Sequence, residues 1–227
     1  MKVTLITHTP NPDNVVATAA KLCYSSKTLT ELYEKNKDAD NEKFLKKLAD
    51  LGHESPLEHA VFTFGIEGVS RALLAQFTRH RIASYSVKSQ RYVDESNMSV
   101  VIPSSIWDNP EKLQAYCEAL RTTEHIYKTL RELGVEKEDA RMVLPNACTT
   151  QMIVTMNARS LLNFFRRRCC NRAQWEIRDV ADEMLRQCKA VAPLLFAKAG
   201  APCMYGSCTE GDMCCKKPRK VEEYVIQ

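Results

Sequence analysis

The spacing of apolar residues along the chain predicts a mixture of helices and short strands, with helices in excess. Apolar residues recur every three or four positions most clearly between Asn109 and Leu133, and Gly134 then ends the pattern. Helices are predicted over residues 14–23, 30–36, 41–51, 69–77, 109–133, 138–144, 158–167 and 174–198. Strands are predicted over residues 2–7, 60–66, 99–102 and 149–156. Asp13 and Asn157 precede two of the helices and are predicted to cap them. The pattern indicates an α+β fold.

The composition is that of an ordinary folded protein, with 44% hydrophobic and 26% charged residues in 227. Residues 1–199 contain no linker and are predicted to form one domain, followed by a Cys- and Lys-containing tail over residues 200–227. No run approaches the ~18–20 apolar residues that a membrane span needs. The N-terminus lacks the apolar stretch and cleavage site of a signal peptide. We therefore expect a cytoplasmic protein with no membrane partner.

Charge is concentrated in two segments rather than spread over the chain. The formal net charge is only +4, yet residues 71–92 carry five Lys or Arg and no acid, and residues 157–175 carry five Arg and no acid. The rest of the chain is therefore mildly acidic. This distribution favours local anion sites over a general nucleic-acid surface.

The chain has ten cysteines, which we expect to be reduced in a cytosolic protein. Six lie in or beside apolar stretches, and most of these are expected to be small buried residues: Cys23, Cys117, Cys148, Cys169, Cys170 and Cys188. Four cluster near the C-terminus: Cys203, Cys208, Cys214 and Cys215. Their spacing lacks paired CxxC units, so incidental thiols in a disordered tail are favoured over a zinc site.

The first segment with candidate chemistry is Arg79-His80-Arg81, followed by several serines and Arg91. Two guanidinium groups beside an imidazole offer planar donors for a phosphate or an electron-rich ring. A basic surface turn without a ligand is an equally good reading of composition alone.

The second candidate is the predicted helix after Asn157. At 100° per residue, Arg159, Asn163, Arg166 and Arg167 share one face, and the opposite face is apolar. Arg168 falls in the apolar arc, where an unpaired cation is costly. Either the helix ends before Arg168, or this side chain points into a buried polar site; the concentration of charge favours the site.

The third candidate is HESPLEH at residues 53–59, between a helix and a strand. Its spacing is not that of the HExxH zinc helix, and Pro56 breaks the helix that such a motif needs. No metal is therefore expected. A loop that presents polar groups to a ligand and a purely structural turn both remain open.

Together and in this order, these segments resemble the flavin-dependent thymidylate synthase family. The family signature is Arg-His-Arg, seven residues, Ser, one residue and Arg, which here reads from Arg79 to Arg91. The resemblance extends over about residues 1–195 through five further segments: HESPLEH at 53–59, AVFTF at 60–64, ARMVLP at 140–145, NARSLLNF at 157–164 and AQWEI at 173–177.

The resemblance implies an FAD-dependent methyltransferase that converts dUMP to dTMP. Methylenetetrahydrofolate is then the carbon donor, FAD the hydride carrier and NADPH the reductant. It also implies a helix-rich single domain with a mainly antiparallel central sheet, assembled as a homotetramer with shared sites. Gln76 and Arg79 of one chain would then meet Arg168 of another. All the ligands are anionic, which gives the two basic segments a purpose.

Site residues are implied position by position. Matches to flavin-binding positions are His53, Ser55, Arg79, His80, Arg81, Val87, Asn157, Arg159 and Asn163. Matches to dUMP-binding positions are Gln76, Arg79, Val87, Lys88, Ser89, Gln90, Arg91, Arg141 and Arg168. Arg168 is also implied as the catalytic residue, because its cation would stabilise negative charge that develops on the pyrimidine.

Three features depart from the family pattern. Val87 stands where many relatives have Glu, Cys23 stands where a relative can have a flavin-contacting Ser, and residues 200–227 lie beyond the segments that resemble the family. Three rival readings stay open: a nucleic-acid-binding module, a family member that binds ligands without turnover, and a scaffold with a zinc-binding tail.

Overall fold

The computed structural model describes residues 1–224, which divide into two compact units. Unit 1 comprises residues 1–2, 66–79 and 86–152, and unit 2 comprises residues 3–65, 80–85 and the chain from residue 153 onward.

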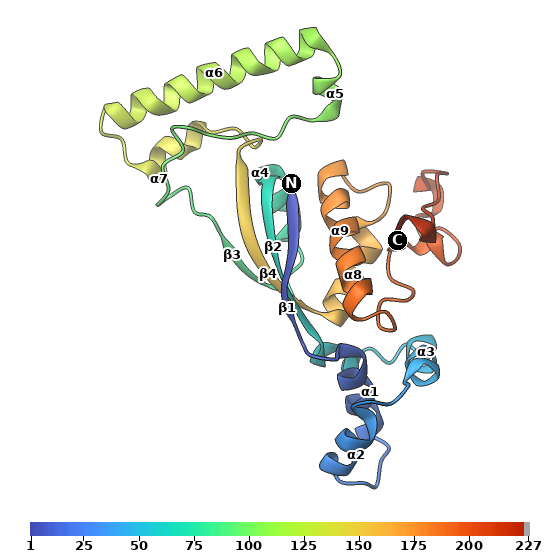
Figure 1. The fold of residues 1–227 in the computed structure, drawn as a ribbon. Helices are drawn as coiled ribbons and strands as arrows, with labels where there is room; N and C mark the ends of the chain where they lie inside the picture. The colour runs from blue at the N-terminus through green and yellow to red at the C-terminus, as the bar shows by residue number, and fades with distance from the viewer. Residues whose placement is uncertain (225–227) are drawn as a thin grey trace. The chain divides into compact units, whose positions relative to one another are not determined.

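The strands are β1 (Lys2–His8), β2 (Val61–Ser70), β3 (Ser84–Val87) and β4 (Thr149–Asn157). They form an antiparallel sheet in the order β1-β2-β4-β3 (Figure 1). The predicted α+β class is therefore confirmed.

The central strands alternate between buried and exposed side chains. Phe62, Phe64 and Ile66 are buried on β2, and Met152 and Val154 are buried on β4, with exposed or partly exposed residues between them. A period of two places every second side chain on the same face. The strand predicted over 99–102 is wrong, because that segment makes only an isolated bridge from Val100 to Cys148.

Unit 2 contains most of the helices. They are α1 (Pro12–Leu22), α2 (Leu29–Asn36), α3 (Glu42–Asp50), the short 3-10 helix η1 (Ser55–His59), α8 (Ala158–Arg168) and α9 (Trp175–Val191). Helix α1 contacts α2, α3 and η1, and α8 contacts η1 and α9. Four buried aromatic rings meet edge to face in this core: Phe62, Phe164, Phe165 and Phe196.

Unit 1 contains α4 (Arg71–Phe77), α5 (Ser104–Trp107), α6 (Pro110–Glu132), α7 (Lys137–Ala140) and the 3-10 helix η2 (Arg141–Val143). The side chain of Asn109 accepts from the Lys112 amide and caps α6, and the buried Tyr127 anchors this helix. None of the helices within residues 1–224 has the length and apolar character that crossing a bilayer requires.

Two predictions about helix ends need correction. Asp13 does not cap α1, which begins at Pro12 after Asn11; its carboxylate instead accepts from the amides of Leu194 and Leu195, at 3.2 and 3.0 Å. The last predicted helix ends at Val191 rather than residue 198. Pro193 explains this end, because proline removes an amide donor and disfavours a helical residue before it.

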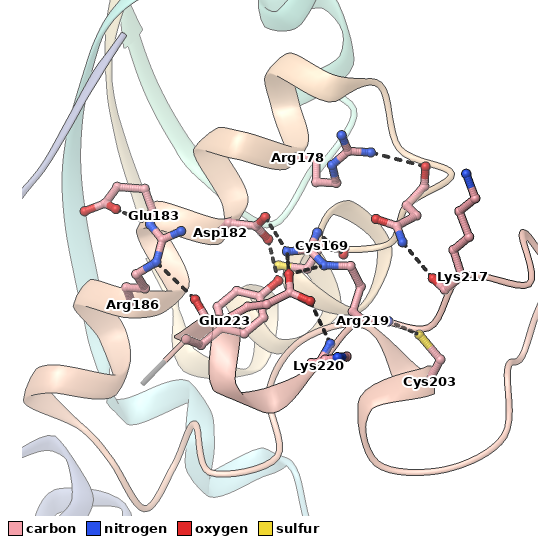
Figure 2. A network of polar contacts seen from close by, with 12 residues as sticks. Cys169, Arg178, Asp182, Glu183, Arg186, Cys203, Lys217, Arg219, Lys220 and Glu223 are labelled. Carbon is pink, nitrogen blue, oxygen red and sulfur yellow. Dashed lines mark hydrogen bonds and ion pairs between the residues drawn. The ribbon is translucent and has the colours of Figure 1, made fainter. Parts of the chain in front are cut away.

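Residues 200–224 of the C-terminal segment pack against the rest of unit 2, which corrects the expectation of a disordered tail. It forms three 3-10 turns, η3 (Pro202–Met204), η4 (Gly211–Met213) and η5 (Val221–Tyr224). The Arg219 guanidinium bonds to the Asp182 carboxylate at 2.8 Å (Figure 2). The buried Tyr224 hydroxyl donates to the same carboxylate at 2.6 Å. These contacts fix the segment on α9.

Candidate functional site

Helix α8 has the polar and apolar faces that the sequence predicts. Asn157 caps it, since its Oδ1 accepts from the Ser160 amide at 2.9 Å. Arg159, Asn163 and Arg167 are exposed, as is Arg166, and the opposite face is buried through apolar side chains. The helix contains no acid in its first turn. Its N-terminus in unit 2 therefore offers amide donors and positive charge together.

Arg168 is the last residue of α8, and its side chain is only partly exposed. Its Nε donates to Nε2 of His80 at 3.0 Å, and the His80 ring meets Phe164 edge to face. The Tyr85 hydroxyl donates to the His80 carbonyl at 2.7 Å. The end of α8 and residues 80–85 therefore form one polar cluster beside the aromatic core of unit 2.

His80 in this cluster is neutral at physiological pH. Burial, followed by the nearby charges of Arg168 and Arg167, lowers the pKa of His80 from 6.5 to about 4. A neutral ring that accepts at Nε2 carries its proton on Nδ1. His80 can therefore orient the Arg168 guanidinium without adding charge. Burial also raises the pKa of Tyr85 to about 12, so its hydroxyl keeps its proton.

HESPLEH places two carboxylates against Arg159. Glu54 accepts from Nε of Arg159 at 3.1 Å, and Glu58 accepts from Nη1 at 2.7 Å. These contacts, the Glu58 bond first, raise the pKa of Arg159. His53 and Ser55 are exposed at the start of the same turn. The motif is thus a polar loop tied to the first turn of α8.

Two cations of the signature segment lack acidic partners. Arg79 and Arg81 are exposed, and neither forms an ion pair within residues 1–224. A structural arginine normally has a carboxylate or carbonyl partner. Unpaired guanidinium groups in a signature segment are therefore available for an anionic ligand.

In unit 1, one acidic residue gathers two of the predicted dUMP arginines. The Glu138 carboxylate pairs with Nε of Arg91, and the Glu138 carbonyl accepts from Nε of Arg141 at 3.0 Å. Lys88 is also held, because its ammonium lies 2.9 Å from the largely buried Glu95. Glu138 and Glu95 were missed from sequence. Glu138 lies two residues before the family motif ARMVLP at 140–145, and its proximity to this motif could have identified it as a candidate.

Gln90 carries an unsatisfied polar group. It is 5% exposed, and its Nε2 donor has no hydrogen-bond partner within residues 1–224. A buried donor without a partner costs about 1–3 kcal/mol, so such groups need an explanation. Gln90 follows Ser89 in the signature, where its amide is suited to bond an acceptor on a bound ligand.

The predicted site residues fall in both units. Unit 1 contains Gln76, Arg79, Val87, Lys88, Ser89, Gln90, Arg91 and Arg141. Unit 2 contains His53, Ser55, His80, Arg81, Asn157, Arg159, Asn163 and Arg168. His80 contacts Arg168 directly. Arg91 and Arg141 both bond to Glu138. Val87 ends β3 and offers no polar side chain.

The burial of the cysteines agrees with the expectation for some of them and not for others. Cys148, Cys169 and Cys188 are buried as expected, whereas Cys23 is exposed. Among residues 1–224, no group of three or more His, Cys, Asp or Glu side chains is arranged to hold a metal ion.

Comparison with known proteins places the chain in a family. A family model described as thymidylate synthase complementing protein matches residues 4–194. A relative from Geobacter sulfurreducens is 51% identical over 224 residues, covering 98% of this chain and 97% of the relative. Relatives from Clostridium tetani and Pyrococcus furiosus are 46% and 43% identical, each covering 100% of this chain and 97% and 98% of the relatives.

All three relatives are named flavin-dependent thymidylate synthase. Since two of these alignments cover the whole chain, the C-terminal segment is part of the shared length rather than an addition beyond it. The match at this identity and coverage shows that the chain belongs to the thymidylate synthase complementing protein family.

Proposed function

We propose that the chain catalyses the reductive methylation of dUMP to dTMP, with methylenetetrahydrofolate as carbon donor, FAD as hydride carrier and NADPH as reductant. The observation that carries this proposal is the nearly full-length match to relatives named flavin-dependent thymidylate synthase. The unpaired cations and polar groups of the signature segment support it independently.

The residues of unit 2 fit an anionic flavin cofactor. The acid-free first turn of α8 offers main-chain amides, and Arg81 offers an exposed guanidinium with no ion pair within residues 1–224. Asn157 uses its Oδ1 for the cap and keeps its amide nitrogen for a ligand. Asn163 and Arg159 lie on the same exposed side of α8. Together with His53, Ser55 and His80, these residues would hold FAD, which supplies the hydride chemistry when bound.

The residues of unit 1 fit the nucleotide. The unsatisfied Gln90 amide would donate to an acceptor of dUMP, and Ser89 adds a neutral donor beside it. Arg91 and Arg141, gathered by Glu138, would bind the phosphate through charge-assisted hydrogen bonds. These chain groups would orient the substrate; none of them is required as a nucleophile.

Arg168 is the residue proposed to act in the chemical step. Its cation would stabilise negative charge on the uracil ring as the ring becomes nucleophilic. Neutral His80 accepts from its Nε and fixes the plane of the guanidinium. A protonated His80 would instead repel Arg168, so the lowered pKa of His80 supports this role.

We also propose a homotetramer in the cytoplasm, with Gln76 and Arg79 of one subunit meeting Arg168 of another. The resemblance supports this assembly. Inactive Arg79→Ala and Arg168→Ala subunits, mixed and reassembled, should then recover part of the parent activity, because some sites regain both arginines. A fully active monomer in size-exclusion chromatography with light scattering would contradict the shared site.

The deciding experiment is a visible spectrum of the purified protein during anaerobic addition of NADPH, with and without dUMP. Flavin absorbance that bleaches faster with dUMP, followed by dTMP formation when methylenetetrahydrofolate is added, is the expected result. A bound flavin that ignores dUMP would favour a member without turnover. No flavin, even after FAD is added, would reject the proposal.

A further inference from the structure

The C-terminal segment and the residues after α8 enclose a pocket of about 210 Å³ that the proposed reaction does not use. Its lining is rich in thiols, and five of the chain's ten cysteines border it: Cys170, Cys203, Cys208, Cys214 and Cys215. Arg172, Lys216 and Lys217 also line it, so the pocket combines sulfur with positive charge.

The walls of this pocket are held by side-chain contacts. Asn171 donates to the Lys217 carbonyl at 2.7 Å, and Arg172 forms an ion pair with Glu210. The Arg219 amide donates to the Cys203 sulfur at 3.5 Å (Figure 2). The thiols therefore lie on a segment fixed to unit 2 at several points.

Main-chain amides point at two of the sulfurs. The Arg219 amide bonds to Cys203 at 3.5 Å, and the Lys216 amide bonds to Cys214 at 3.4 Å. Lys216 adopts a left-handed conformation with φ 55°, which is uncommon for a residue with a Cβ and aims its amide back at Cys214. Amide donors on sulfur stabilise the thiolate form, which is the reactive one.

Cys208 and Cys214 form an unequal pair. The Lys216 amide and then the Cys208 thiol lower the pKa of Cys214 below its usual value. The Glu210 amide acts to lower the pKa of Cys208, but the neighbouring Cys214 thiol raises it above its usual value. Cys208 is exposed and Cys214 is partly exposed, so small reagents can reach both.

The buried thiols of the same chain differ in both respects. Burial raises the pKa of Cys169, Cys188 and Cys148, and none of them is exposed. A thiol of raised pKa in an apolar core is inert toward exchange. Among the cysteines with a resolved pKa change, Cys214 is therefore the one best suited to act as a nucleophile.

We propose that Cys208 and Cys214 form a redox-active dithiol that undergoes exchange with a disulfide, with Cys214 as the attacking sulfur and Cys208 as the resolving one. The basic lining from Lys216 and Lys217 favours an anionic low-molecular-weight disulfide. This site lies outside the residues assigned to flavin or dUMP, and it does not depend on the proposed function.

The exchange balances without a further oxidant. The Cys214 thiolate attacks one sulfur of the disulfide, a mixed disulfide forms, and one thiolate leaves. Cys208 then gives its proton to solvent and attacks the Cys214 sulfur, which releases the second thiolate. The two cysteines lose two electrons together, and the external disulfide gains them as it becomes two thiols.

The test uses the full-length protein, reduced and desalted without oxygen, and oxidised glutathione as the probe. Remaining thiols are alkylated, and peptides are identified by mass spectrometry. The parent should form the Cys208–Cys214 disulfide. The Cys208→Ser variant should stop with one glutathione on Cys214, and the Cys214→Ser variant should form neither product.

Cys215→Ser is the matched control, because Cys215 is the neighbour of Cys214 and its thiol donates to the Lys217 carbonyl. It should react as the parent does. An uncharged disulfide should react more slowly than glutathione disulfide, and circular dichroism should show that each variant is folded. Equal reaction at the exposed Cys23, a different cysteine pair, or a stoichiometric zinc ion released on alkylation would each overturn the proposal.

Discussion

Two arginines lie at the C-terminal end of α8 in unit 2. One is paired with carboxylates, and the other contacts a neutral imidazole. Arg219 is about 10% exposed and lies between two carboxylates, Asp182 at 2.8 Å and Glu223 at 2.5 Å. Arg168 donates instead to the neutral ring of His80 at 3.0 Å. Two carboxylates cancel the charge of Arg219, whereas the contact of Arg168 with the neutral His80 ring brings no opposite charge.

We propose that this difference separates a structural cation, Arg219, from a functional one, Arg168. Arg219 also donates to the carbonyl of Cys169, the residue after Arg168, so the C-terminal segment fixes the position where α8 ends. Removing a buried cation that is paired with carboxylates leaves those carboxylates uncompensated, and a cation beside a bound substrate can stabilise negative charge on it. Loss of Arg219 should therefore reduce stability, and loss of Arg168 should reduce activity.

The largest expected effect is on stability. Arg219→Ala leaves the Asp182 carboxylate buried without its cation, which should lower the free energy of unfolding by about 3–5 kcal/mol. Urea unfolding followed by circular dichroism measures this change. Arg172→Ala, which breaks the more exposed pair with Glu210, is the control and should cost under ~1 kcal/mol. Equal effects of the two substitutions would remove the distinction between the buried and exposed pairs.

Arg168→Ala should act on turnover instead. Loss of a preorganised positive group at developing negative charge reduces the rate by about 10²–10³-fold. Bound FAD should be retained, and the unfolding free energy should change by less than ~1 kcal/mol. Arg167→Ala, an exposed neighbour on the same helix, is the control and should lower dTMP formation far less. Parent-like turnover of Arg168→Ala would end the catalytic assignment of this residue.

His80 provides a pH-dependent test of the same cluster. Its pKa is lowered to about 4 in the folded chain, so the unfolded chain binds more protons between pH 6.5 and about 4. The stability that neutral His80 contributes is complete above pH 6.5 and is lost as the pH falls through this window.

Two measurements check this expectation. The stability difference between the parent and His80→Gln should shrink as the pH falls from 7.5 to 4.5 in urea unfolding. Arg167→Ala removes one of the charges that depress the pKa of His80, so an NMR titration should show a higher pKa in that variant. A His80 that titrates at its ordinary value in the parent would contradict the buried neutral ring.

Local patterns were sufficient to predict α8 and its cap. Apolar residues at helical spacing fix which face is buried, and the Asn157 cap is a local bond to an amide in the first turn of the same helix. The family motifs also identified the basic segments. By contrast, β3 was missed, because Ser84–Val87 is only four residues long and sits within a polar segment.

Contacts between distant residues were outside the reach of these patterns. Asp13 bonds to amides more than 180 positions away, and Arg219 meets Asp182 across 37 positions. Nothing in the local sequence of Asp13 distinguishes that role from a helix cap. The same reason explains the C-terminal segment: its composition is polar, and its contacts reach distant residues, among them the Asp182 carboxylate on α9 that receives both Arg219 and Tyr224.

Arg159 is intermediate between the two arginines, and it gives the smallest predicted effect. It pairs with Glu54 and Glu58 as Arg219 does with its carboxylates, but all three side chains are about half exposed. Exposed ion pairs contribute about 0.2–1 kcal/mol, so Glu58→Gln should barely change the free energy of unfolding.

The Glu58→Gln substitution also removes an acid that competes with an anionic cofactor for Arg159. FAD affinity, measured by fluorescence titration, should therefore rise by up to about fivefold, since 1.4 kcal/mol corresponds to about tenfold. Weaker FAD binding by Glu58→Gln would instead mean that Glu58 positions Arg159 for the cofactor, and Arg159 would then belong with Arg168 rather than with Arg219.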